Sequence, residues 1–173
     1  MGVLERYKAV DVLAEAWRLA APRVPEATLH LVGRGALREV PQALARDLPE
    51  QTRWTESLST PEVARALDEA SVLVLPSRSE GLGRVVVEAF CRGRGVIGSR
   101  VGGIPDLVQD GVSGILVEPG NAHTLADALV SALADRERAG ELGAAAHTAV
   151  QPWLATPQEY ARRIRELVDQ VTA

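Results

Sequence analysis

Cysteine and aromatic residues are scarce in this chain of 173 residues. Cys91 is its only cysteine, so a disulfide within the chain and a metal site built from several thiolates are both excluded. Aromatic residues make up 3% of the sequence and the formal net charge is −4, which removes the usual signs of a nucleic-acid-binding surface. Any phosphate-binding site must therefore be built locally. The three histidines share no spacing typical of metal ligands, so no metal site is predicted.

Long apolar runs are also missing. No stretch approaches 18 uninterrupted apolar residues, and the first residues lack the basic and then apolar pattern of a signal peptide. Hydrophobic residues make up 46% and charged residues 24%, which is typical of a soluble globular domain and not of a disordered chain. We therefore expect one domain without a transmembrane segment, in the cytoplasm.

Strand and helix patterns alternate along most of the chain. Short apolar runs predict strands at residues 28–32, 52–54, 72–75, 95–99 and 114–117. Apolar residues at helical spacing predict helices that begin near Ala9, Leu37, Pro61 and Gly83, and the chain from Asn121 onward is expected to be entirely helical. Strands separated by helices of about ten residues require crossover connections, which predict a mostly parallel sheet covered on both faces. The predicted fold class is therefore α/β, with a Rossmann-like, doubly wound parallel sheet.

The start of the chain does not fit this pattern completely. Residues 1–4 are too few for a full strand, although the alternation requires one before the helix at Ala9. In the doubly wound order the first strand is central, so its loss would expose core surface on both neighbours. We therefore expect a first strand that is truncated or cut short.

The most informative segment is Ser77–Glu88, which directly follows the apolar strand predicted at residues 72–75. It contains two glutamates, Glu80 and Glu88, with seven residues between them, and a predicted helix that begins near Gly83. A helix start approached by glycines leaves unpaired backbone N–H groups and the positive end of the helix dipole exposed, and both favour a phosphate. The segment therefore predicts an anion site flanked by two carboxylates.

This arrangement resembles the E-x7-E signature of retaining, nucleotide-sugar-dependent glycosyltransferases with the GT-B fold, of family 4 and its glycogen synthase relatives. The resemblance implies that Glu80 is the catalytic residue, placed at the reacting face of the donor sugar. It implies that Glu88 binds the ribose hydroxyls, and that Gly81, Leu82 and Gly83 offer backbone N–H groups to the β-phosphate. The family usually has an aromatic residue where Leu82 stands.

Lys8, the only lysine of the chain, lies in a segment that is similar to the one whose lysine neutralises the pyrophosphate in this family. A positive charge there would stabilise the departing nucleoside diphosphate. The family usually has an arginine five residues earlier, where this chain has Val3. The resemblance therefore implies one cation fewer than expected, unless Arg6 or Arg84 substitutes for it.

Two further turns resemble those that surround the nucleoside in the family. Gly33 lies in a Gly-Arg-Gly turn after a predicted strand and would pass close to the nucleoside, although such a turn serves equally well to connect a strand to a helix. Ser57 and Leu58 would flank the base, next to Glu56, which replaces a glycine common in the family. The Gly-Gly-Ile-Pro-Asp segment at residues 102–106 resembles a turn that shapes the pocket wall.

The resemblance covers residues 1–173 and implies the donor-binding, C-terminal half of a GT-B enzyme. It implies transfer of a sugar from a nucleotide sugar to an acceptor hydroxyl with retention of configuration. An N-terminal acceptor domain would have to come from outside this chain, so the isolated chain is expected to bind the donor without efficient transfer. The nucleotide sugar is a substrate, and neither a cofactor nor a metal is expected, because GT-B enzymes generally stabilise the diphosphate with helix dipoles and basic side chains.

Two other functions are alternatives to the donor-binding half of a glycosyltransferase. A nucleotide-binding module without catalysis would share the glycine loop and the ribose carboxylate. A dinucleotide-binding oxidoreductase domain would require a G-x-G-x-x-G sequence after the first strand and an acidic residue after the second, and the chain has neither.

Overall fold

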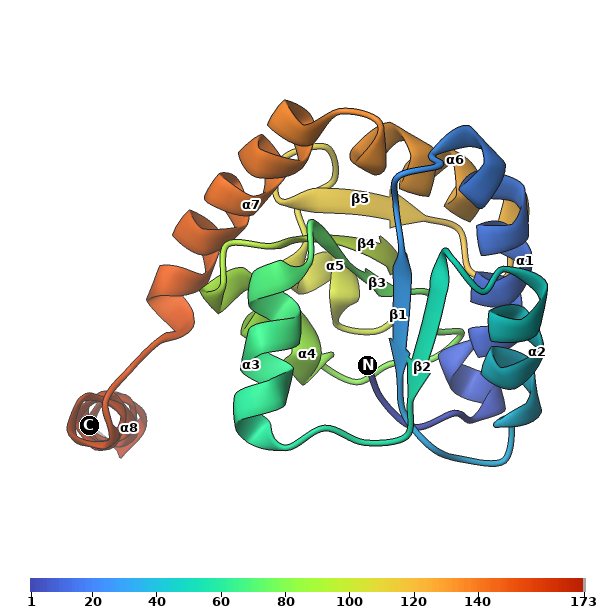
Figure 1. The fold of residues 1–173 in the computed structure, drawn as a ribbon. Coiled ribbons are helices and arrows are strands. Elements are labelled where there is room, and N and C mark those ends of the chain that lie inside the picture. Colours follow the sequence, from blue (N-terminus) through green and yellow to red (C-terminus); the bar gives the residue numbers. More distant parts are fainter. Residues whose placement is uncertain (173) are drawn as a thin grey trace.

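The computed structural model describes residues 1–172 as five strands in two sheets, with helices packed around them (Figure 1). Strands β1 (Leu29–Val32) and β2 (Thr52–Thr55) form one sheet. The second sheet contains β3 (Val72–Leu75), β4 (Gly95–Ser99) and β5 (Gly114–Val117), in that order. The predicted Rossmann-like α/β fold with parallel strands is confirmed, and each predicted strand is found within about one residue of its expected bounds.

Eight α-helices connect and cover the strands within the described part of the chain. They are α1 (Val10–Ala20), α2 (Glu39–Asp47), α3 (Thr60–Glu69), α4 (Arg84–Cys91), α5 (Ile104–Leu107), α6 (Ala122–Leu133), α7 (Arg136–Val150) and α8 (Pro157–Thr172). Single 3₁₀ turns occur at η1 (Arg6–Lys8), η2 (Ala21–Arg23) and η3 (Gln151–Trp153). The prediction that the chain is helical from Asn121 onward is confirmed within the described residues, apart from residues 134–135 and a break at residues 154–156. Pro157 explains the break, since a proline disfavours the helical conformation of the residue before it.

The apolar core has two parts. One lies between α1, α6 and the β1–β2 sheet, and its largest fully buried side chain is Trp17 on α1. The other lies between α4, α5, α7 and the three-stranded sheet, around Phe90. Strand β4 is buried along its whole length, as expected for a parallel strand covered on both faces.

The sheet that the sequence predicts as one unit is divided in two. Strand β1 pairs with β2 and β3 pairs with β4, while no strand precedes α1 within residues 1–172. The five described strands therefore form two parallel sheets, where the sequence predicts a single doubly wound sheet. The first residues instead extend the ladder of β1 beyond its end. Gly2 N–H donates to the carbonyl of Val32 and Leu4 N–H to that of Arg34, both at 2.9 Å.

Helix α8 projects away from the rest of the molecule (Figure 1). All of its described side chains are exposed, including the apolar residues Ile164, Leu167, Val168 and Val171. None of the helices within residues 1–172 is long and apolar enough to cross a membrane. Helix α8 is thus an amphipathic helix that contributes little to the core.

Deleting residues 155–173 should change the free energy of unfolding by less than about 1 kcal/mol, because the deletion removes no buried side chain. Chemical denaturation followed by circular dichroism measures this change. As a control, deletion of residues 136–173 also removes α7, with buried Leu142, Ala146 and Val150, and should prevent folding. A large loss of stability from the shorter deletion would contradict the peripheral role of α8.

Candidate functional site

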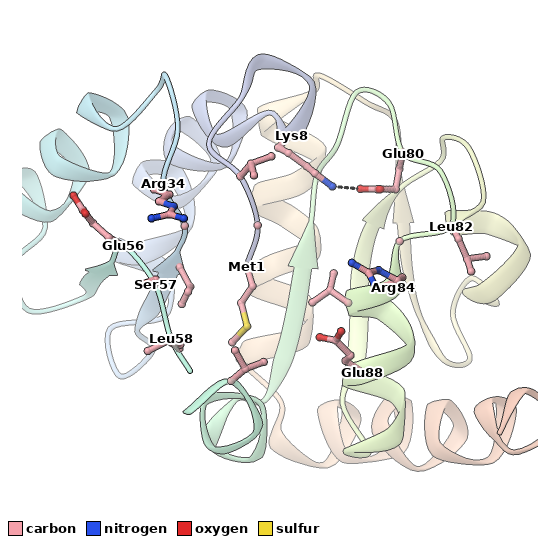
Figure 2. Close-up of a pocket in the computed structure, with 17 residues that line it drawn as sticks. Met1, Lys8, Arg34, Glu56, Ser57, Leu58, Glu80, Leu82, Arg84 and Glu88 are labelled. Carbon is pink, nitrogen blue, oxygen red and sulfur yellow. Dashed lines mark hydrogen bonds and ion pairs between the residues drawn. The ribbon is translucent and has the colours of Figure 1, made fainter. Parts of the chain in front are cut away.

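A pocket of about 570 Å³ opens where the chain leaves β1, β2 and β3 (Figure 2). The turn after β1 and the loop after β2 form one wall, and the loop after β3 with the first turns of α4 forms the other. The N-terminal segment, from Met1 to Lys8, lies between the two walls. In parallel α/β sheets, ligands bind beyond the carboxyl ends of the strands, so this is the expected place for a site.

Lys8 and Glu80 form an ion pair inside this pocket (Figure 2). Both side chains are mostly buried, and the hydroxyl of Ser77 also donates to the Glu80 carboxylate, at 3.3 Å. The Lys8 ammonium lies 5.4 Å from the centre of the Tyr7 ring, which adds a cation–π contact. The carboxylate and the ammonium are therefore held in one place although they are 72 residues apart in the sequence.

Arg78 holds together the two segments that carry this ion pair. Its backbone N–H donates to the carbonyl of Tyr7 at 2.7 Å, and its guanidinium donates to the carbonyl of Arg6 at 2.8 Å. The guanidinium also binds both carboxylate oxygens of Asp11, at 2.9 and 2.8 Å. The loop after β3 is thus fastened to the start of α1 on either side of Lys8.

The hydrogen bonds from Arg78 lower the pKa of Asp11. Because the pKa is lowered in the fold, the stabilisation is present above the ordinary aspartate pKa and is lost as the pH falls through the lowered value. Both side chains are largely exposed, so solvent screens the pair and its contribution to stability is small. Its main effect is on the position of Lys8 relative to Glu80.

The other wall of the pocket near Glu80 is the start of α4. Gly83 is the N-terminal cap of this helix and has a φ of +71°, in the left-handed region that glycine adopts without strain. Glu88 and Arg84 lie one turn apart on the side of α4 that faces the pocket (Figure 2). This wall of the pocket therefore combines the N-terminal end of a helix with the guanidinium of Arg84 and the carboxylate of Glu88.

The opposite wall is built around Gly33. A Cβ atom at this position would lie 1.8 Å from the carbonyl oxygen of Gly2, so only glycine allows the N-terminal segment to pass. The indole N–H of Trp54 donates to the Gly33 carbonyl at 3.0 Å and fixes the turn. Ser57 and Leu58 lie further along the same wall (Figure 2).

The residues predicted from the sequence come together in this pocket with one exception. The pocket is lined by eight of them: Lys8, Gly33, Ser57, Leu58, Glu80, Leu82, Gly83 and Glu88. Gly81 does not line it. Its carbonyl accepts a hydrogen bond from Gly103 N–H at 2.7 Å, which fastens the glutamate loop to the Gly-Gly-Ile-Pro-Asp turn. The placement of these residues is observed, and the role of each stays a prediction.

The sequence offered two arginines, Arg6 and Arg84, in place of the one expected at Val3, and the structure shows which of them lines the pocket. Val3 and Arg84 line the pocket, whereas Arg6 does not. Arg34 lines the pocket too and was not predicted. The signal that could have revealed it is its position between two glycines directly after a strand, where the backbone turns toward the ligand edge of the sheet. Lys8, Arg34 and Arg84 are thus the basic residues that line the pocket, Arg84 on the α4 wall and Arg34 on the opposite one.

Comparison with known proteins identifies the family of this chain. Residues 1–135 match the family of glycosyl transferases group 1. The chain belongs to this family. Among curated relatives of this group 1 domain, the sulfoquinovosyl transferase SQD2 of Arabidopsis thaliana is 34% identical over 140 residues, which cover 79% of this chain and 27% of that protein. A GDP-mannose-dependent phosphatidylinositol monomannoside mannosyltransferase of Mycolicibacterium smegmatis is 33% identical over 156 residues, covering 84% of this chain and 41% of that protein.

Solved structures show the same fold for this group 1 domain. The C-terminal domain of a group 1 glycosyl transferase, LpcC of Francisella tularensis, has a TM-score of 0.79 at 21% identity and covers 88% of this chain and 82% of its own. The Anabaena protein HepE in complex with UDP-glucose has a TM-score of 0.82 at 22% identity, covering 97% of this chain and 48% of its own. The chain therefore has the fold of a C-terminal GT-B domain and spans less than half the length of the curated relatives described above.

Proposed function

We propose that this chain binds a nucleotide sugar in the pocket and supplies the donor side of a retaining glycosyltransferase. The observation that carries the proposal is the convergence of Lys8, Glu80, Glu88 and the start of α4 on one cavity. The start of α4, Lys8 and Arg84 would bind the diphosphate, because they offer unpaired N–H groups and positive charge. Glu88 would accept hydrogen bonds from two neighbouring ribose hydroxyls.

Glu80 would lie at the donor sugar in this proposal. Its ion pair with Lys8 and its hydrogen bond from Ser77 hold the carboxylate in place, where it would stabilise positive charge as the bond at the anomeric carbon breaks. Retention of configuration is supported by the E-x7-E spacing. In a protein that also contains an acceptor side, the one-bond coupling between the anomeric carbon and its proton in the product would report the configuration by NMR. An inverted product would contradict the proposal.

The nucleotide base of the donor has to be identified by experiment, because the relatives differ in the donors named for them. The mannosyltransferase relative is named as GDP-mannose-dependent, whereas HepE was solved with UDP-glucose. Calorimetric titration of the chain with UDP, GDP and ADP should show that at least one nucleoside diphosphate binds more tightly than inorganic pyrophosphate. Equal affinity for all four ligands would contradict a nucleotide site.

Glu88→Ala should weaken the binding of the preferred nucleoside diphosphate about tenfold and leave pyrophosphate binding within about twofold. The loss corresponds to hydrogen bonds from the ribose to a charged group, worth roughly 1.5 kcal/mol, whereas pyrophosphate has no ribose. Glu50→Ala is a matched control, because Glu50 is exposed and lies outside the pocket. Equal losses for both ligands would contradict the ribose role of Glu88.

We further propose that the isolated chain transfers little or no sugar, because the acceptor side would be formed by a second domain. The fraction of the curated relatives that this chain covers supports this division. Incubation with UDP-glucose or GDP-mannose should release no nucleoside diphosphate that depends on an added acceptor. Rapid acceptor-dependent release would show that one domain is sufficient.

A nucleotide-binding module without catalysis is the second candidate. It is favoured by two features of the pocket: Glu80 neutralises Lys8, and the apolar Val3 takes the position of an expected arginine. Glu80→Gln separates the two functions. A donor site should lose affinity for the nucleotide sugar relative to the nucleoside diphosphate, because the sugar loses its carboxylate partner. In a module that binds only the nucleotide, the ratio of the two affinities should not change.

A further inference from the structure

Arg34 is the basic residue on the pocket wall that also contains Ser57 and Leu58. It lies in the turn after β1, whereas Ser57 and Leu58 belong to the loop after β2. Figure 2 shows Arg34 on the same side of the N-terminal segment as Ser57, and Glu88 on the other side. Arg34 therefore lies across the pocket from the start of α4, which is expected to bind the diphosphate in the proposed function.

Hydrogen bonds fix the backbone of the turn that carries Arg34. Gly33 N–H donates to the carbonyl of Thr55 at 3.0 Å, and the Arg34 carbonyl accepts from Leu4 N–H at 2.9 Å. The indole N–H of Trp54 donates to the Gly33 carbonyl at 3.0 Å. These bonds join the turn to β2 on one side and to the N-terminal segment on the other. The Arg34 side chain therefore starts from a fixed position next to the loop after β2.

The guanidinium of Arg34 makes neither an ion pair nor a hydrogen bond with any other group of residues 1–172. Glu56, the carboxylate on the same wall, is paired with another arginine, because its Oε1 accepts from Arg38 on α2 at 3.2 Å. Its side chain points away from Met1 (Figure 2). Arg34 is also exposed, so the five N–H donors of its guanidinium are available to a ligand.

A guanidinium can discriminate between nucleotide bases, because it donates hydrogen bonds and accepts none. Guanine and uracil have a carbonyl oxygen, O6 or O4, at the ring position where adenine and cytosine have an amino group. The carbonyl oxygen accepts a hydrogen bond from the guanidinium. The amino group is itself a donor and would face the guanidinium without a hydrogen bond. A site built to hydrogen-bond one ligand disfavours an analogue that leaves its polar group unpaired.

We propose that Arg34 recognises the base of the donor and selects a base with this carbonyl group, guanine or uracil, over adenine and cytosine. The inference rests on the proposed function, because it requires a nucleotide whose base lies against Ser57 and Leu58 while its diphosphate lies at the start of α4. The chain would then accept GDP-sugars or UDP-sugars and disfavour ADP-sugars. Because Arg34 is exposed and water competes for its N–H groups, the expected selectivity is about tenfold.

Two pairs of ligands isolate this contact. IDP and ADP differ at position 6 of the purine ring, and UDP and CDP differ at position 4 of the pyrimidine ring, where one member of each pair has the carbonyl and the other the amino group. Calorimetric titration measures the affinity of the chain for these four nucleotides and for inorganic pyrophosphate. In the pair that binds more tightly, the carbonyl member should exceed the amino member about tenfold. The purine pair would identify a guanine donor and the pyrimidine pair a uracil donor.

Arg34→Leu should reduce this ratio of affinities to within about twofold of one and leave pyrophosphate binding within about twofold, because only the contact with the base is lost. Arg34→Lys keeps one charged donor and should retain part of the ratio, which separates a lost hydrogen bond from a disturbed turn. Arg46→Leu is a matched control that should change neither quantity, because Arg46 is exposed on α2 and lies outside the pocket.

Three results would overturn the inference. If Arg34→Leu weakens all four nucleotides equally, Arg34 contacts the base without distinguishing its functional groups. If the same variant weakens pyrophosphate as much as the nucleotides, Arg34 binds the diphosphate. If the original chain binds nucleoside diphosphates more tightly than pyrophosphate but does not discriminate within either pair, the role of Arg34 is wrong while the proposed function stands. If no nucleoside diphosphate binds more tightly than pyrophosphate, the inference and the proposed function are both wrong.

Discussion

Lys8→Ala should weaken the binding of a nucleoside diphosphate and of inorganic pyrophosphate by about thirtyfold each. Lys8 is the only lysine of the chain and the pocket cation paired with Glu80. A hydrogen bond from a charged donor to a phosphate is worth about 1.5–3 kcal/mol, and each 1.4 kcal/mol changes the affinity tenfold. Calorimetric titration at constant ionic strength measures both affinities. Because the lost contact is to the diphosphate, the two ligands should be affected alike, in contrast to Glu88→Ala.

The ion pair between Lys8 and Glu80 also predicts a change of affinity in the opposite direction, for a substitution of Glu80. In the unliganded chain, Glu80 and the phosphate compete for the Lys8 ammonium. Glu80→Gln removes the competing charge and its repulsion, so the variant should bind pyrophosphate several times more tightly than the original chain. Unchanged pyrophosphate affinity in both Lys8→Ala and Glu80→Gln would show that the ammonium does not contact the diphosphate.

Trp17→Ala should lower the free energy of unfolding by about 3–5 kcal/mol, the range typical for removing a large side chain from a core. Trp17 is 1% exposed, and its indole N–H donates to the Gln51 carbonyl at 3.2 Å. Its loss would enlarge a cavity of about 790 Å³ that Trp17 lines and remove the hydrogen bond between α1 and Gln51. Urea denaturation followed by circular dichroism measures the change without relying on tryptophan fluorescence.

Trp153→Ala is the matched control for this substitution. Trp153 follows α7 and is 53% exposed, so the same change of side chain should alter the free energy of unfolding by less than about 0.5 kcal/mol. Comparable losses from both variants would mean that burial in the core does not set the contribution of Trp17.

The local pattern was sufficient to predict the elements that carry the site. A strand at residues 72–75, a glycine turn and a helix near Gly83 are each defined by neighbours in the sequence, and all three are found. The breaks at residues 134–135 and 154–156 lie between helices that the spacing of apolar residues predicts on both sides. Pro157 begins α8, and a proline disfavours the helical conformation of the residue before it.

The sequence alone determined the order of strands and helices, the parallel fold class, and the glutamates that flank the glycine loop after β3. These follow from periodicity and turn residues, which act over a few positions of the chain. Only the tertiary structure decided that Lys8 pairs with Glu80, that Arg84 and not Arg6 lines the pocket, and that the described strands form two sheets. Such contacts join segments up to 72 residues apart. The geometry of these contacts depends on how the strands pair and how the helices pack against them. The spacing of neighbouring residues in the sequence does not specify this.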